Sequence, residues 1–84
     1  MLNFKVYILQ SDKDNSFYIG YTSDLEKRLD YHNTGKSRYT SKKMPWKLVY
    51  YEEYPTRADA IGREKFLKRQ KNRNFYLQLI SGKK

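Results

Sequence analysis

The sequence predicts an α+β fold, because two short apolar runs joined by turn residues are followed by the start signal of a helix. The runs, Phe4–Leu9 and Phe17–Tyr21, are rich in the aromatic and β-branched residues that favour strands. Ser23 and Glu26 then stand at the spacing of a helix capping box. With 84 residues and no cysteine, the chain is expected to be a single small domain without disulfides, ending in a short disordered basic tail.

The first two strands are expected to form a β-hairpin. A tip between Asp12 and Lys13 would place Tyr7 and Tyr18 directly opposite each other on one face of the sheet. The same face would carry Gly20, whose missing side chain would let a ligand approach closely.

The capping box predicts a helix from about Asp24 to Asn33, with Leu25 and Leu29 on its buried side. The next segment, Gly35–Pro45, is polar and basic, and we expect a mobile loop over a cleft there. Trp46–Tyr54 is again rich in aromatic and β-branched residues and predicts a third strand.

The last third of the chain predicts two further helices. Pro55-Thr56 opens the first, with Asp59 at its third position, and Asn72 caps the second. Their expected apolar positions are Ala60, Ile61 and Leu67 on the first and Phe75, Tyr76, Leu79 and Ile80 on the second.

Glu64 lies on the apolar stripe of the first of these two helices. A carboxylate turned inward is costly unless it is paired or bound to a metal ion. Glu64 is therefore either a metal ligand or the ion-pair partner of Arg63, Lys68 or Arg28.

The charge of the chain is strongly one-sided. Lys and Arg number 18 against 9 Asp and Glu, which gives a net charge of +9, and the excess is concentrated in residues 36–47 and 63–84. Such a surface favours a polyanion, with nucleic acid as the obvious candidate, although it could also be a solvated lysine-rich surface. No run approaches the roughly 20 apolar residues of a membrane span, so we expect a soluble cytoplasmic protein without membrane contact.

The side chains suited to phosphodiester chemistry are Tyr7, Tyr18, Arg28 and His32. Hydrolysis of a phosphodiester needs an activated water, a cation on the phosphate and a metal ion that absorbs developing charge. Each residue also has an ordinary structural interpretation. The tyrosines could be a cross-strand packing pair, Arg28 a partner of Asp24, and His32 a helix cap or a buried hydrogen-bonding residue. Their occurrence together with Glu64 and a basic segment favours chemistry.

Lys5-Val6-Tyr7 and Tyr18-Ile19-Gly20 resemble the two half-motifs of the GIY-YIG nuclease superfamily. The second half-motif is intact, and the first keeps only its tyrosine. The superfamily includes the nuclease domain of the bacterial excinuclease C subunit and certain homing endonucleases. The chain is similar to a small stand-alone member, from Lys5 to about Asn74.

The resemblance also matches single residues of the family. Its arginine, histidine and metal-binding glutamate correspond to Arg28, His32 and Glu64, and Asn72 and Asn74 both qualify for an asparagine beyond the glutamate.

The resemblance implies a three-stranded antiparallel sheet flanked by about three helices, in the order β-β-α-β-α-α. It also implies endonuclease activity on DNA, as in excinuclease C-like DNA repair, with one Mg²⁺ or Mn²⁺ ion held by Glu64. Tyr7 or Tyr18 would help deprotonate the attacking water, Arg28 would neutralise the transition state, and His32 would orient a partner or handle a proton. A free tyrosine has a pKa of about 10, so a base role requires the metal and nearby cations to lower that pKa.

DNA is the expected partner of a monomer or weak dimer, and a separate protein could supply targeting. Tyr39 would either stack on an unpaired base or pack against the cleft wall. Two alternatives stay open: a nucleic-acid-binding domain without useful catalysis, and a small basic structural or partner-binding protein. The residues expected to contact DNA are Gly20, Lys36, Arg38, Tyr39, Lys42, Lys43, Lys68 and Lys71.

Overall fold

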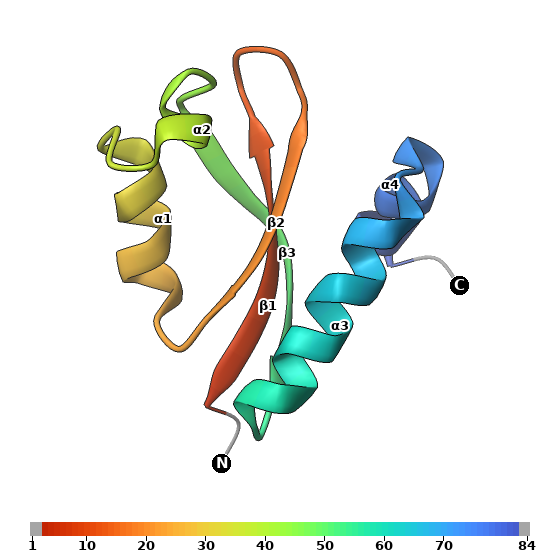
Figure 1. Cartoon of the computed structure of the whole chain (residues 1–84). Helices are drawn as coiled ribbons and strands as arrows, with labels where there is room; N and C mark the ends of the chain where they lie inside the picture. Colours follow the sequence, from red (N-terminus) through yellow and green to blue (C-terminus); the bar gives the residue numbers. More distant parts are fainter. Residues whose placement is uncertain (1–2, 83–84) are drawn as a thin grey trace.

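The computed structural model describes residues 3–82 as a three-stranded sheet with helices on both faces (Figure 1). The strands are antiparallel in the order β2-β1-β3, so β2 and β3 form the two edges. The elements in chain order are β1 (Phe4–Ser11), β2 (Phe17–Thr22), α1 (Leu25–Asn33), α2 (Arg38–Ser41), β3 (Trp46–Tyr54), α3 (Arg57–Gln70) and α4 (Arg73–Ser81).

The predicted α+β class and three-stranded antiparallel sheet are confirmed, and α2 is a fourth helix that the sequence did not predict. None of the helices in residues 3–82 has both the length and the apolar character needed to cross a bilayer. The basic tail expected at the C-terminus, Lys83 and Lys84, lies outside the described residues.

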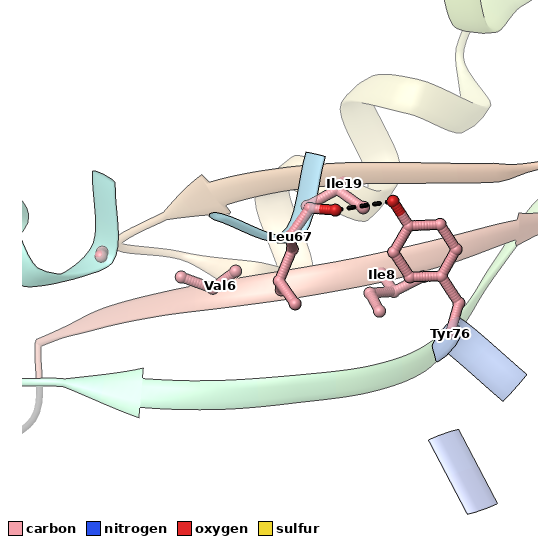
Figure 2. Packing of buried hydrophobic residues seen from close by; sticks show 6 residues of the cluster. Val6, Ile8, Ile19, Leu67 and Tyr76 are labelled. Atoms are coloured by element: carbon pink, nitrogen blue, oxygen red, sulfur yellow. Dashed lines mark hydrogen bonds between the residues drawn. The ribbon is translucent and has the colours of Figure 1, made fainter. Parts of the chain in front are cut away.

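One hydrophobic core lies between the sheet and the pair α3 and α4. Val6 and Ile8 of β1 are fully buried against Leu67 of α3 and Tyr76 of α4 (Figure 2). The Tyr76 hydroxyl donates a hydrogen bond of 2.6 Å to the Leu67 carbonyl, which joins the two helices. Ile61, expected on the buried stripe, belongs to neither core of the described chain, because it is turned about 100° around the helix from its neighbour at position 60.

A second core lies on the opposite face of β1. Tyr7 and Leu9 pack there with Trp46, and Leu25 and Leu29 of α1 cover them. Strand alternation therefore separates the two sets of residues as expected. The face of β1 that carries Tyr7 and Leu9 packs against α1. The face that carries Val6 and Ile8 packs against α3.

The register of the hairpin differs from the prediction by two residues. Tyr7 pairs with Gly20, and Tyr18 pairs with Leu9. The strands reach further than expected, because the loop is closed by Asn15, whose φ of 63° lies in the left-handed region. The Asn15 amide donates to the Ser11 carbonyl at 2.9 Å. A shift of two residues keeps both tyrosines on one face, with their ring centroids 6.5 Å apart.

Helix α1 begins one residue later than the capping box suggested. Asp24, not Ser23, is the N-cap, and its carboxylate accepts from the Lys27 amide at 3.1 Å. Thr22 holds this turn, because its hydroxyl accepts from the Asp24 amide at 3.0 Å. The caps predicted for α3 and α4, Thr56 and Asn72, are both confirmed.

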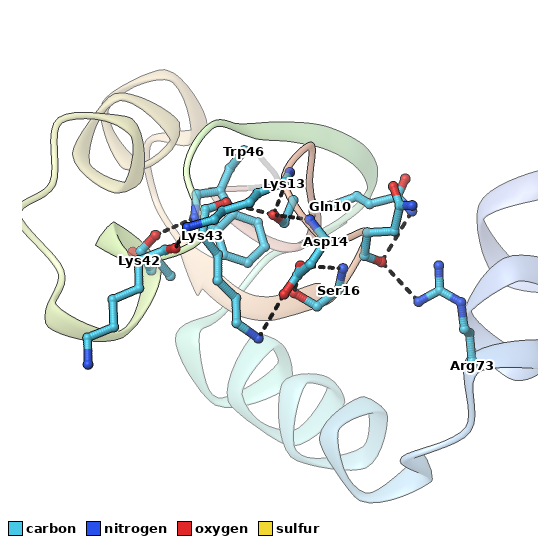
Figure 3. A network of polar contacts seen from close by, with 11 residues as sticks. Gln10, Lys13, Asp14, Ser16, Lys42, Lys43, Trp46 and Arg73 are labelled. Atoms are coloured by element: carbon cyan, nitrogen blue, oxygen red, sulfur yellow. Dashed lines mark hydrogen bonds and ion pairs between the residues drawn. The ribbon is translucent and has the colours of Figure 1, made fainter.

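The segment Gly35–Pro45 contains helix α2 and is packed onto the fold, so it is not the loop over a cleft that we expected. Thr40 of α2 is fully buried, and its carbonyl accepts from the Trp46 indole at 2.9 Å. The Lys43 carbonyl accepts from the Ser11 hydroxyl at 2.7 Å. Figure 3 shows the same segment against the β1–β2 loop, where the Lys43 ammonium lies 3.4 Å from the Asp14 carboxylate. These bonds hold α2 beside the tyrosine face.

Candidate active site

A cleft of about 320 Å³ lies beside the edge strand β2. Gly20 and Tyr21 are consecutive on β2 and point to opposite faces, yet both line the cleft, so it reaches around the sheet edge from the α1 side to the α3 side. Four of the five residues predicted to be catalytic line it: Tyr7, Tyr18, Arg28 and Glu64. Their catalytic roles stay predictions.

Arg28 reaches the cleft from the first turns of α1. The alternative that it pairs with Asp24 is wrong, since no ion pair joins these side chains within residues 3–82. The guanidinium instead lies 5.1 Å over the ring of Tyr31. Such a contact keeps the charge in place without neutralising it, which leaves the cation available for an anion in the cleft.

Gly20 leaves room for the side chain of Tyr7. A Cβ built at this position would lie 2.5 Å from the Tyr7 hydroxyl oxygen and 2.7 Å from the Tyr7 ring carbon that carries it. The Tyr7 phenol therefore occupies the space that we expected to be open to a ligand. The reason is the two-residue register shift, which sets Gly20 directly opposite Tyr7.

Replacing Gly20 by Ala is expected to displace the Tyr7 ring and to destabilise the fold by about 1–3 kcal/mol. The free energy of unfolding from chemical denaturation measures the effect. Gly62→Ala is the matched control, because a Cβ at Gly62 in α3 would meet no atom within 4 Å. That change is expected to stabilise the helix by about 0.5–1 kcal/mol. A Gly20→Ala variant as stable as the wild type would show that Tyr7 does not need this space.

His32 does not lie in the cleft but behind Tyr7, with an exposed fraction of 2%. Its Nε2 is 3.1 Å from the Tyr7 hydroxyl, and its Nδ1 is 2.9 Å from the Thr40 hydroxyl. Burial, aided by the charge of Arg28, lowers the pKa of His32 below its ordinary value, so the ring is neutral at neutral pH. The expectation that all five residues share one concave surface is therefore wrong for His32, which lies behind Tyr7 and Tyr18 and hydrogen-bonds to Tyr7.

The two tyrosines differ in their surroundings. Tyr7 is buried, and burial together with the nearby Tyr18 raises the pKa of Tyr7 above its ordinary value, against the opposing effect of Arg28. Tyr18 is half-buried, and its ring centroid is 4.7 Å from that of His32. Tyr7 is thus held in its protonated form, which suits a hydrogen-bond donor better than a base.

Glu64 extends into the cleft from α3, and 15% of its side chain is exposed. Of its suggested ion-pair partners only Lys68 is seen in the described chain, at 3.4 Å, because Arg63 instead forms a bidentate pair with Glu52 at 2.9 Å. Lys68 is half exposed, so the pair is a weak one that water or a metal ion can replace.

The donor set in the cleft fits a single hard cation. The Glu64 carboxylate is an oxygen ligand of the kind that Mg²⁺ and Mn²⁺ accept, and Mg²⁺ commonly keeps several waters besides one or two carboxylates. No group of three or more acidic, histidine or cysteine side chains is gathered anywhere in residues 3–82. Among the described residues that line the cleft, Glu64 is the only acidic one, whereas a two-metal site usually draws on several carboxylates. Neither Asn72 nor Asn74 lines the cleft, and the Asn72 side chain is used to cap α4.

Arg57 is a cleft residue that we did not predict. It stands at the start of α3, seven residues before Glu64, and its guanidinium lies 5.5 Å over the ring of Phe4. Residues seven apart share a helix face, so this spacing was a signal in the sequence. Arg57 adds a second cation to the cleft, on the wall opposite α1.

The residues expected to contact DNA lie mainly beside the cleft. A smaller depression of about 230 Å³ adjoins it at Tyr18 and is also lined by Tyr39 and Lys68. A third depression, which shares Tyr39, is lined by Arg38, Lys42 and Lys43. Tyr39 is 56% exposed, with its ring 6.1 Å from that of Tyr18, so it borders the cleft without being buried in its wall.

The remaining expected contacts are distributed as follows. Lys36 is exposed before α2. Lys71 ends α3 in a left-handed conformation, and its amide donates to the Tyr76 hydroxyl at 3.2 Å. The Lys42 side chain points away from the polar network around Asp14 (Figure 3).

Comparisons with family models and with known proteins point to the same family. Residues 3–77 match the model of the GIY-YIG catalytic domain. A UPF0213 protein of Clostridium perfringens is 47% identical over 79 residues, which cover 93% of this chain and 83% of that protein. A UPF0213 protein of Streptococcus pneumoniae is 42% identical over 67 residues, covering 79% of this chain and 67% of that protein.

A solved structure supports the same assignment. The solution NMR structure of a UPF0213 protein from Bacillus halodurans is 35% identical and superimposes with a TM-score of 0.58, over 93% of this chain and 82% of that one. The family model covers most of the chain, and sequence and fold agree with it. The chain belongs to the GIY-YIG family.

Proposed function

We propose that this protein is a metal-dependent DNA endonuclease that hydrolyses phosphodiester bonds with one metal ion. GIY-YIG catalytic domains are nuclease domains, which supports the general class. The observation that carries the proposal is the cleft, where one carboxylate, three phenols and two guanidinium groups line a space of about 320 Å³. These are the groups that phosphodiester hydrolysis requires.

The residues of the cleft divide the chemistry among them. Glu64 holds Mg²⁺ or Mn²⁺, which when bound stabilises the negative charge that develops on the scissile phosphate. Arg28 and Arg57 bind phosphate oxygens from the α1 and α3 walls. Tyr18, the less buried tyrosine, takes a proton from the attacking water. Tyr7 keeps its proton and donates a hydrogen bond into the cleft, with His32 behind it as a positioning residue.

A second candidate is a nucleic-acid-binding domain without useful catalysis. The ion pair of Glu64 with Lys68 favours it, because the carboxylate must leave this partner, or share it, before it binds a metal ion. In either case DNA is the partner, and a separate protein could supply targeting to a domain of this size. The proposed role in DNA repair rests on the resemblance to the excinuclease C nuclease domain alone.

A nicking assay separates the two candidates. Supercoiled plasmid is incubated with the purified protein and Mg²⁺ or Mn²⁺, with a chelator in the parallel reaction. Conversion to nicked or linear DNA that stops on chelation is the expected result. DNA binding without any cleavage under either metal would leave only the second candidate.

Neutralising Lys42 and Lys43 is expected to weaken DNA binding and its dependence on salt. The logarithmic slope of affinity against salt is about −0.9 per phosphate neutralised, so the double Gln variant should be shallower by up to about two units. Lys42 should contribute the larger part, because Lys43 is already paired with Asp14. Phosphate contacts carry no base information, so sequence preference should not change.

Binding titrations at several salt concentrations measure this slope. Lys65→Gln is the control, since it removes one exposed charge of α3 outside the cleft. A double variant with the wild-type slope and intact cleavage would place DNA on another face of the protein.

A further inference from the structure

The polar side chain of Thr40 is buried, although the segment around it is polar and basic. It lies in the single-turn helix α2, within a polar and basic segment, yet its exposed fraction is 0%. Burying a hydroxyl is unfavourable unless it forms a hydrogen bond. The Thr40 hydroxyl has one such partner in the described chain, His32 Nδ1 at 2.9 Å.

Three side chains form a continuous chain of hydrogen bonds from α2 to the cleft. The Thr40 hydroxyl contacts His32 Nδ1, and His32 Nε2 contacts the Tyr7 hydroxyl at 3.1 Å. A neutral imidazole carries one N–H donor and one acceptor nitrogen. The two bonds can therefore run in only two directions, and the direction decides where the Tyr7 proton points.

The burial of Thr40 selects between these directions. If Tyr7 donated to Nε2 and Nδ1–H donated to Thr40, the Thr40 proton would be left buried with no acceptor among residues 3–82. If Thr40 donates to Nδ1 and Nε2–H donates to the Tyr7 oxygen, the proton left over is that of Tyr7. Tyr7 lines the cleft, where water or substrate can accept this proton.

We propose that Thr40 is a positioning residue of the active site, which holds His32 as the Nε2–H tautomer and thereby turns the Tyr7 proton into the cleft. This role rests on the proposed nuclease function. The same hydrogen bonds connect α2 to Tyr7. Arg38 of α2 and the neighbouring Lys42 are expected to contact DNA. Substrate that shifts α2 would act on Tyr7 through Thr40.

The first test is the tautomer of His32 in the wild-type protein, which needs no activity. His32 is the single histidine of the chain, so its ring ¹⁵N signals can be assigned without ambiguity. At neutral pH we expect Nε2 to carry the proton and Nδ1 to show the shift of an acceptor nitrogen. A proton on Nδ1 would overturn the inference.

The second test compares Thr40→Val with Thr40→Ser, measuring kcat and KM on a DNA that the wild type cuts. Val keeps the shape and removes the donor, so kcat should fall about tenfold while KM changes little, as for the loss of one hydrogen bond. Ser keeps the hydroxyl and should retain most of kcat. The Val variant should also lose the acceptor shift at Nδ1.

The outcomes separate a failure of the role of Thr40 from a failure of the proposed nuclease function. Wild-type cleavage with an unchanged kcat in Thr40→Val overturns the role of Thr40 and leaves the nuclease function standing. A fall in kcat that Ser does not rescue, with the His32 signals unchanged, also overturns it, because packing alone would then explain the loss. A wild-type protein that cuts no DNA overturns the proposed function, and the role of Thr40 in catalysis falls with it.

Discussion

Replacing Glu64 by Gln is expected to reduce metal-dependent DNA cleavage by several orders of magnitude while the fold and the affinity for DNA survive. Gln keeps the size of the side chain and removes the charge that would bind Mg²⁺. The lost ion pair with Lys68 should cost little stability, because Lys68 is half exposed and such pairs contribute about 0–1 kcal/mol. Cleavage rates with Mg²⁺, thermal unfolding and DNA binding without metal give the three measurements.

Two control variants make the result specific for the metal role. Glu53→Gln removes the same charge and also breaks an ion pair, that of Glu53 with Lys5 at 3.6 Å, but it lies outside the cleft. It should cut DNA at the wild-type rate. Lys68→Met removes the partner and keeps the carboxylate, so it should retain metal-dependent cleavage with weaker DNA binding. If Glu64→Gln cleaves near the wild-type rate, Glu64 is not the metal ligand.

Removing the hydroxyl of Tyr18 or Tyr7 is expected to abolish most cleavage, but the two Phe variants should differ in two other properties. The first is stability. The Tyr18 hydroxyl forms no hydrogen bond to protein among residues 3–82, so Tyr18→Phe should unfold like the wild type. Tyr7→Phe leaves His32 Nε2 buried without its partner and should lose about 1–3 kcal/mol.

The second property is the pH dependence of cleavage. A base must be deprotonated to act, so with Tyr18 as the base the rate should rise with pH in the wild type. This rise should persist at a lower rate in Tyr7→Phe and should vanish from whatever activity Tyr18→Phe retains. The raised pKa of Tyr7 opposes the reverse assignment, because burial keeps that phenol protonated. Rates from about pH 6 to 9 at constant Mg²⁺ measure it. If both Phe variants were fully active, neither tyrosine hydroxyl would take part in catalysis, and both residues would only pack in the fold.

The candidate site was predictable where it depends on chemical type and on spacing along one element. Tyr7, Tyr18, Arg28 and Glu64 were identified from such features, and all four line one cleft. The interpretation of their neighbours was less successful. Position along the chain does not show whether a side chain lies in front of a reacting group or behind it. The sequence therefore left open whether His32 is a cleft residue or a buried hydrogen-bonding residue, and the structure shows the second.

Two further misses have the same cause. The space beside Gly20 was expected to be open to a ligand, but the Tyr7 phenol occupies it, because the cross-strand partner depends on a loop that closes through the left-handed Asn15. The basic segment was expected to be a loop over a cleft, yet it contains α2 and is held by bonds to Trp46 and Ser11. Both contacts join residues of different elements, and local propensity carries no information about them.

The sequence by itself determined the α+β class, the strand Trp46–Tyr54, the caps Thr56 and Asn72 and the alternation of faces along β1. These features depend on backbone conformations and on hydrogen bonds between residues at most a few positions apart. Only the tertiary structure decided the hairpin register, the burial of His32 and the contact of Thr40 with it. Those contacts are set by which surfaces meet when the helices close over the two faces of the sheet, and packing of distant residues decides that outcome.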